Sequence, residues 1–111
     1  MQVTATEADF PSGPWAGFYQ QDGRSYPQQL ELTFTGGVVR GGGWDGLGEF
    51  SIKGCYELDT REVRWTKCYE SGRRLQFRGF REGRGIWGTW QDPGLKRAGF
   101  HIWPLADPSA E

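Results

Sequence analysis

Apolar and polar residues alternate along this chain in short runs, and turn residues separate one run from the next. The runs recur about every ten residues, and no segment keeps a helical period over the length of a helix. A period of two is typical of a strand that buries one face. We therefore predict eight strands, at Trp15–Gln21, Gln28–Thr35, Val38–Trp44, Leu47–Glu57, Glu62–Glu70, Arg74–Arg81, Arg84–Gln91 and Ala98–Pro104.

The connections between these strands are short, which makes neighbouring strands antiparallel. Asp-Gly and Gly-Gly are favoured two-residue turns, and each turn sets the register of the two strands beside it. In the predicted register no hairpin needs a side chain to change face. The predicted cross-strand pairs include Tyr19–Leu30, Thr35–Val38, Val39–Ile52, Ile52–Lys67, Lys67–Phe77, Phe77–Gly88 and Trp90–Phe100.

One face of the resulting ribbon is strongly apolar. Its large side chains are Trp15, Tyr19, Leu30, Leu32, Phe34, Phe50, Ile52, Tyr56, Val63, Trp65, Tyr69, Leu75, Phe77, Ile86, Trp90, Phe100 and Ile102. Glycines lie between them, and small residues beside large ones are typical of a barrel interior.

Eight strands in up-and-down order should close, because closure removes unpaired edges. We predict an all-β fold, a single eight-stranded antiparallel barrel over about residues 15–104. The 111 residues make one domain, and the segments 1–12 and 105–111 are expected to be irregular.

The segment Gly13-Pro14-Trp15-Ala16-Gly17-Phe18-Tyr19 leads into the first predicted strand. An eight-stranded meander that opens on such a Trp/Gly strand resembles the calycin group of avidin-like and lipocalin-like barrels. The resemblance covers Trp15 to Pro104 in architecture, and the length is closer to that of the avidins. It implies a ligand inside the barrel mouth. The chain has no Asn and lacks the spaced Ser and Thr residues that avidins direct at biotin, so we assign no biotin-binding residue.

The charge and the N-terminal residues restrict partners and location. With 13 basic and 14 acidic residues the net charge is −1, so we expect neither nucleic acid nor a membrane surface as a partner. Neither a signal peptide nor a transmembrane span is recognisable, and we expect a cytoplasmic protein. Gly41 to Gly46 matches G-x-G-x-x-G. A strand follows it where a dinucleotide site needs a helix, so we expect a hairpin and no cofactor.

Cys55 and Cys68 are predicted to face outward on adjacent strands, opposite Arg64 and Ser51 respectively. They are about 13 Å apart along the strands, at roughly 3.3 Å per residue. That separation is too long for a disulfide, so we expect free thiols. Two Cys and the single His101 at these positions do not make a zinc site, and we assign no metal.

Lys67 has the parity of an inward residue, and no inward carboxylate is recognised on any predicted strand. A buried ammonium group without a partner is costly. Two interpretations stay open. Either the side chain extends to the barrel mouth, where tyrosine hydroxyls assist it, or it meets an anionic or carbonyl-bearing ligand.

The candidate ligand site lies at the end of the barrel where the first, third, fifth and seventh strands end. It combines a cationic anchor, tyrosine hydroxyls, aromatic walls and glycines that leave room, a composition typical of a small apolar pocket. These residues are Lys67, Tyr19, Tyr69, Trp65, Trp90, Phe100, Gly43 and Gly48.

We expect loops to surround the end of the barrel that holds the candidate site and a plug of side chains to fill the opposite end. Asp22, Asp45 and Asp92 lie in the loops around the candidate site, and we interpret them as turn residues. At the opposite end, inward Arg81 is expected to form a plug with Trp15 and Phe34, covered by the N-terminal segment.

A second candidate site is an outer aromatic surface made of Phe18, Arg78, Trp87, His101 and Trp103. We predict that Trp87 pairs with Trp103, that Arg78 lies beside Trp87, and that His101 faces Thr89. Exposed aromatic residues grouped in this way mark an interface. The alternative is an ordinary scatter of surface aromatics.

Three functions therefore stay open. The leading one is a protein that binds a small, largely apolar or anionic ligand at one barrel mouth. The alternative is a non-enzymatic interaction or homo-oligomerisation module with a solid core. An enzyme would need Lys67 as a Schiff-base or acid/base residue, and no catalytic residue is assigned, since His101 faces outward without a nucleophile beside it.

Overall fold

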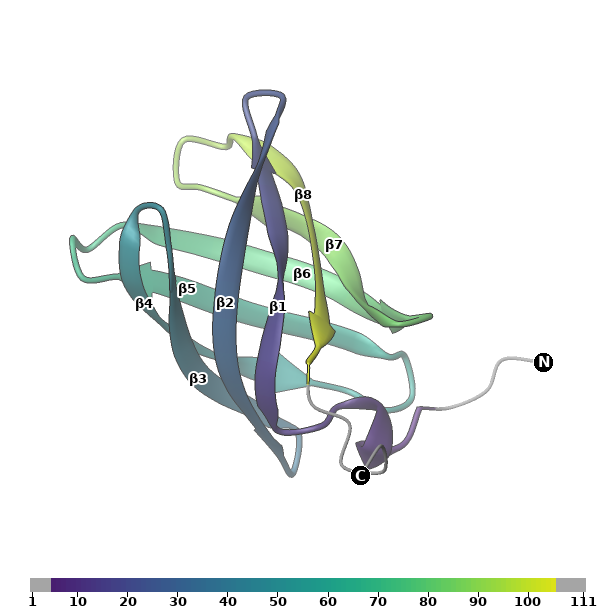
Figure 1. Cartoon of the computed structure of the whole chain (residues 1–111). Helices are drawn as coiled ribbons and strands as arrows, with labels where there is room; N and C mark the ends of the chain where they lie inside the picture. The colour runs from purple at the N-terminus through teal and green to yellow at the C-terminus, as the bar shows by residue number, and fades with distance from the viewer. Residues whose placement is uncertain (1–4, 106–111) are drawn as a thin grey trace.

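The computed structural model describes residues 5–105, and in it the strands form a closed antiparallel barrel in chain order (Figure 1). The fold class predicted from the sequence is confirmed. The strands are β1 (Gly13–Gln21), β2 (Arg24–Thr35), β3 (Val38–Asp45), β4 (Gly48–Tyr56), β5 (Glu62–Tyr69), β6 (Arg74–Glu82), β7 (Gly85–Gln91) and β8 (Arg97–Pro104). A short 3-10 helix, η1 (Glu7–Asp9), precedes them.

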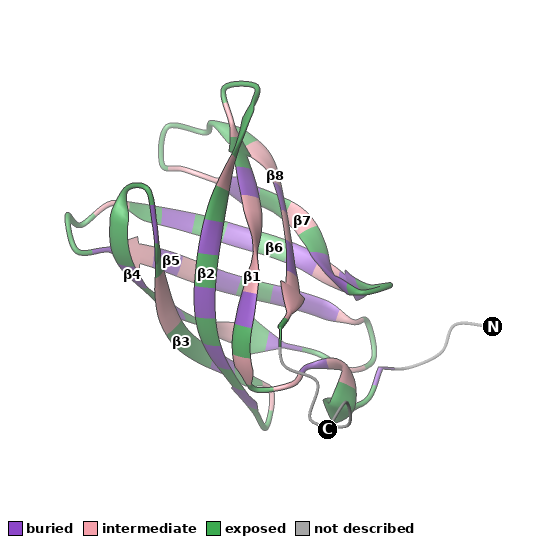
Figure 2. Ribbon diagram, in the orientation of Figure 1, coloured by how far each residue is buried: buried purple, intermediate pink, exposed green. Residues whose placement is uncertain are grey.

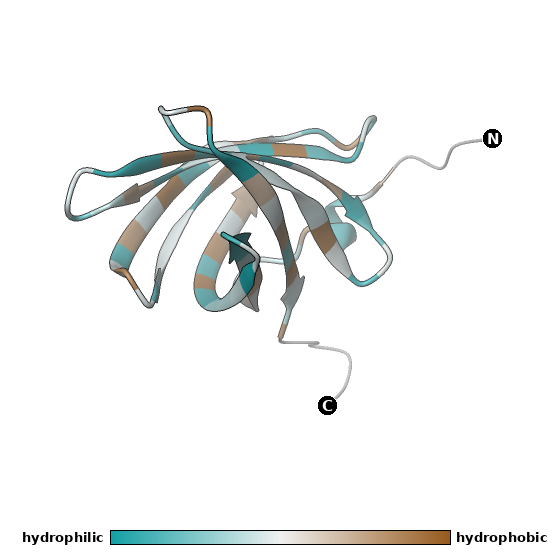
Figure 3. Cartoon of the chain, turned by 90° about the horizontal axis from the view of Figure 1, so that it is seen from above, coloured by the Kyte–Doolittle hydropathy of each residue, from teal (hydrophilic) through white to brown (hydrophobic). Residues whose placement is uncertain are grey.

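Buried and exposed residues alternate along the strands, most regularly along β2 (Figure 2). Hydrophobic and hydrophilic bands alternate in the same way when the barrel is viewed from above (Figure 3). Every large side chain predicted to face inward is buried, and Val39, Phe10 and Ala5 join this core. A period of two thus builds the barrel, because each strand buries one face only.

The register of several hairpins differs from the prediction by two residues. Asp45 pairs with Gly48, so that Gly46 and Leu47 form the turn in place of Asp45 and Gly46. The reason is local: the Asp45 carboxylate accepts a hydrogen bond from the Leu47 amide at 2.8 Å, and Gly48 adopts a φ of +121°.

Because a shift of two residues preserves side-chain direction, these differences leave every face unchanged. Thr35–Val38 and Ile52–Lys67 pair as predicted. The predicted pairs that the structure replaces become Val39–Gly54, Lys67–Leu75, Phe77–Trp90 and Gly88–Phe100.

The first hairpin differs more, since Tyr19 faces Tyr26 and Leu30 faces Trp15. Strand β2 begins at Arg24 and passes through Pro27, a residue that favours strand ends or edges. Pro27 therefore obscured the first part of this strand in the sequence.

Residues 5–12 cover one end of the barrel, as predicted for the N-terminal segment, of which residues 1–4 lie outside the described residues. The Phe10 ring lies 5.5 Å from that of Phe34 and 4.9 Å from that of Tyr56. The Arg81 guanidinium donates to the backbone carbonyl of Asp9, and the Tyr56 hydroxyl donates to the Glu7 carboxylate at 2.8 Å. This plug leaves the opposite end, with the turns after β1, β3, β5 and β7, as the location of the candidate site.

The described part of the chain contains no helix long and apolar enough to cross a membrane. Of the tail predicted to be irregular, residues 106–111 lie outside the described residues.

Candidate functional site

Lys67, on β5, is completely buried and forms an ion pair inside the barrel. Its Nζ donates to Asp45 Oδ2 at 2.6 Å and to Gln28 Oε1 at 3.1 Å. Three strands thus contribute to one polar cluster: β2 carries Gln28, β3 ends with Asp45, and β5 carries the lysine. Of the two interpretations left open, the one in which the lysine side chain escapes to solvent at the barrel mouth is wrong, because Lys67 is completely buried.

The expectation that no carboxylate faces inward is also wrong. Asp45 is only 5% exposed, and it does more than form a turn. Val39, Gly41 and Gly43 face inward on the same strand, so Asp45 shares their parity. That signal is present in the sequence, but a turn assignment for an Asp-Gly pair concealed it.

Tyr69 completes the cluster, because its hydroxyl donates to Asp45 Oδ2 at 2.6 Å. The carboxylate therefore accepts from an ammonium group and a phenol at the same oxygen. Burial raises the pKa of Tyr69, and the hydrogen bond to Asp45 raises it further because it favours the neutral phenol. Tyr69 is thus held as a donor.

Aromatic rings surround the Lys67 ammonium group. It lies 4.2 Å from the centroid of the Phe50 ring and 4.6 Å from that of Tyr19. Burial lowers the pKa of Lys67 to about 8, against the opposing effect of Asp45. Burial also raises the pKa of Tyr19. The charge is compensated by groups of the chain itself, with no external anion needed to pair it.

The predicted aromatic walls pack on one another. The Trp65 ring lies 5.8 Å from that of Phe100, and Phe77 lies 4.9 Å from Phe100. Trp90 Nε1 donates to the Gln20 carbonyl at 2.9 Å. Trp65 Nε1 is buried and has no hydrogen-bond partner among the described residues.

The glycines predicted to leave room have other roles. A Cβ on Gly43 would overlap the carbonyl oxygen of Gln29 on β2 and lie 2.9 Å from the Phe50 ring, so this glycine permits close strand approach. Gly48 is exposed, with a φ of +121°, and serves the turn after β3. Their interpretation as pocket space is therefore wrong.

Four surface hollows formed by described residues have volumes of about 210 to 450 Å³. Lys67 lines none of these four. The structure brings Lys67, Tyr19 and Tyr69 together as predicted, but around Asp45 and Gln28, which the sequence analysis did not assign to the site.

The outer aromatic surface is a contiguous cluster on β7, β8 and β1. Trp87 stacks on His101 with ring centroids 3.3 Å apart and an interplanar angle of 12°. His101 lies 5.0 Å from Trp103, and Phe18 lies 6.0 Å from His101. Trp87 remains 49% exposed. Strand β1 closes against β8 and brings Phe18 to the cluster, as predicted.

Details of this surface differ from the prediction. Trp87 is opposite His101, so the predicted Trp87–Trp103 and His101–Thr89 pairs are wrong. Phe80 is the β6 residue opposite Trp87. We therefore define the outer aromatic face as Phe18, Phe80, Trp87, His101 and Trp103.

Arg78, predicted to lie beside Trp87, is on the neighbouring strand but two residues out of register with it. It is opposite Thr89, and its guanidinium lies 5.2 Å from the Phe80 ring centroid. The expected contact between an arginine and an aromatic ring exists, but with a different ring.

The remaining groups considered for chemistry in residues 5–105 are the two cysteines, possible metal ligands and His101. Cys55 and Cys68 are free thiols opposite Arg64 and Ser51, as predicted. No group of three or more His, Cys, Asp or Glu residues in this range could hold a metal ion. Burial lowers the pKa of His101, whose Nε2 has no partner among the described residues.

Comparison of the chain with models of protein families, with curated proteins and with solved structures gave no match.

Proposed function

We propose that this protein is a non-enzymatic interaction module that self-associates through its outer aromatic face. The observation that carries this proposal is Trp87: the ring is held by stacking on His101 at 3.3 Å, yet 49% of the residue remains exposed. Rigid aromatic side chains bury large areas at little entropic cost, and exposed aromatic clusters are typical of interfaces.

Two properties of the chain support association with a second copy. The net charge of −1 gives little repulsion between copies. Aromatic rings and the Lys67–Asp45 pair occupy the interior of the barrel. An interaction surface is therefore expected on the exterior, where the outer aromatic face lies.

Sedimentation velocity over a range of protein concentrations tests the proposal. We expect wild type to form dimers and the Trp87→Ala/Trp103→Ala variant to remain monomeric under the same conditions. Trp44→Ala is the matched control, because Trp44 is 54% exposed but lies on β3, away from the face. A wild type that stays monomeric at every concentration contradicts the proposal, as does a double variant that dimerises like wild type.

A second candidate is a small-molecule-binding protein with calycin-like architecture, as the closed eight-stranded meander suggests. The observation in its favour is Trp65 Nε1, a buried donor without a partner among the described residues. A ligand acceptor atom would satisfy it. The Lys67–Asp45 pair argues against Lys67 as the anchor, because binding an anion there would first require breaking a buried ion pair.

A further inference from the structure

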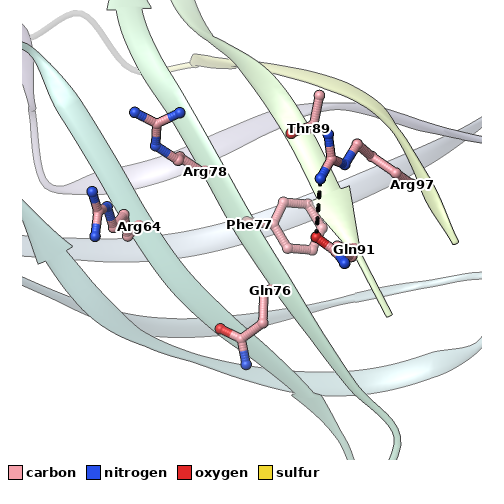
Figure 4. A pocket seen from close by; sticks show the side chains of 7 residues that line it. All are labelled: Arg64, Gln76, Phe77, Arg78, Thr89, Gln91 and Arg97. Carbon is pink, nitrogen blue, oxygen red and sulfur yellow. Dashed lines mark hydrogen bonds between the residues drawn. The ribbon is translucent and has the colours of Figure 1, made fainter. Parts of the chain in front are cut away.

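A hollow of about 450 Å³ lies on the outer surface of the barrel, across β5, β6, β7 and the start of β8 (Figure 4). It adjoins the outer aromatic face, because Arg78 lines the hollow and its guanidinium lies 5.2 Å from the Phe80 ring centroid. Its lining is rich in arginine and amide side chains: Arg64, Gln76, Phe77, Arg78, Thr89, Gln91 and Arg97.

Positive charge is concentrated here although repulsion between like charges lowers the stability of the fold. Arg64 and Arg78 are directly opposite each other on β5 and β6, and like charges in that arrangement repel. Their side chains are 63% and 58% exposed. Both Nε groups donate to the same oxygen, Glu62 Oε2, with Arg78 at 2.7 Å. These hydrogen bonds lower the pKa of Glu62 and so keep it ionised.

One carboxylate does not neutralise this cluster. Arg97 adds a third cation, so the lining holds three guanidinium groups and no carboxylate. Glu62 pairs with two of them and Glu57 acts on Arg64 electrostatically, which leaves positive charge in excess on a chain whose net charge is −1. Glu62 also orients two of the guanidinium groups by binding their Nε, and no hydrogen bond within the described residues uses the terminal nitrogens of Arg64 and Arg78.

The neutral side chains around the hollow also present donors. Gln76 Oε1 already accepts from the Thr66 hydroxyl at 3.0 Å, and Gln91 Oε1 accepts from Arg97 at 3.4 Å (Figure 4). The amide nitrogens of both glutamines therefore remain as donors, in addition to the terminal nitrogens of Arg64 and Arg78. A lining that offers chiefly donors recognises an acceptor-only ligand.

We propose that this hollow binds the phosphate group of a small phosphate monoester. Near neutral pH such a group carries a charge between about −1.5 and −2 and three acceptor oxygens, which match the local charge and the donors. Arginine forks bind phosphate oxygens in bidentate fashion. The volume lies within the range of roughly 300–1,000 Å³ that small-molecule sites occupy.

Titration of the ¹⁵N-labelled full chain with phenyl phosphate at low ionic strength and about pH 8, where the monoester is a dianion, tests this proposal. We expect saturable shifts of the Gln76 and Gln91 side-chain amides and of the Arg64 and Arg78 Nε signals. Arg64→Gln and Arg78→Gln should each weaken binding about tenfold or more, because each removes a charge-assisted contact.

Arg40→Gln is the matched control. Arg40 is exposed on the outer surface of β3 and is opposite another cation, Lys53, but it does not line this hollow. Its loss should leave the affinity for phenyl phosphate unchanged. Thermal melting of each variant checks that the fold is intact. The chemical-shift changes that phenyl phosphate causes in wild type locate the site without the use of any variant.

Three results would overturn the proposal. The first is the absence of saturable shifts at the hollow. The second is an equal loss of affinity in Arg40→Gln and Arg78→Gln, which would indicate non-specific electrostatic attraction of phenyl phosphate to the protein surface. The third is equally tight binding of succinate, which would assign the hollow to carboxylates.

Discussion

At the scale of single residues, the burial of Lys67 could be predicted from the sequence, but its partners were not identified. Its parity identifies it as a buried cation, and the structure buries it completely. Its partner was missed because Asp45 is followed by glycine, and a turn explains Asp-Gly so readily that the strand parity of Asp45 was not considered. Gln28 was missed for a similar reason. It shares the inward parity of Leu30 and Leu32, and the correctly predicted Thr35–Val38 register places it opposite Asp45, but a polar residue at the strand end was not assigned to the interior.

The buried pair predicts a specific pattern of stability. Lys67→Met and Asp45→Asn should each lower the free energy of unfolding by about 3–5 kcal/mol, because each leaves a buried partner uncompensated. The double variant should lose less than the sum, since neither charge is then buried alone. Urea unfolding monitored by tryptophan fluorescence measures all three.

Lys53→Met is the control for this series, because Lys53 is exposed on β4. It should change the free energy of unfolding by no more than about 0.5 kcal/mol. If Lys67→Met were as mild as Lys53→Met, the ion pair would not be an important part of the core.

At the scale of strands, the sequence determines which side chains face inward more securely than it determines register. Side-chain direction follows from alternation, which a shift of two residues preserves. The turns set the register, and their residues depend on details such as the bond from the Leu47 amide to the Asp45 side chain. The sequence analysis interpreted inward glycines as open space or as small partners of large side chains, whereas the neighbouring backbone shows that Gly43 permits close strand approach.

Gly43 tests this distinction. Gly43→Ala should lower the free energy of unfolding by about 1–3 kcal/mol or more, because the added methyl group overlaps the β2 backbone at Gln29. Gly46→Ala is the matched control in the adjoining turn, where a Cβ would meet nothing within 4 Å. Thermal and urea unfolding measure both. Equal effects would contradict the role of Gly43 in strand approach.

At the scale of the whole molecule, the groups that stabilise the barrel lie inside it and at its ends, and the proposed interaction surfaces lie on its exterior. The N-terminal segment covers one end, and the Lys67–Asp45–Tyr69 cluster lies within the other. The exterior carries the aromatic face on β6, β7, β8 and β1 and the basic hollow beside it. Alternation predicted the closed barrel and the existence of an aromatic cluster. The basic hollow was not predicted, because it depends on cross-strand pairs two residues away from the predicted register.

Native mass spectrometry of the purified protein tests the central claim most directly, since it reports the number of copies and any retained ligand together. The account predicts a species of two chains, each of 12.6 kDa, with no additional mass. A monomeric wild type, with or without a retained small molecule, would contradict it, as would a Trp87→Ala/Trp103→Ala variant that is still a dimer.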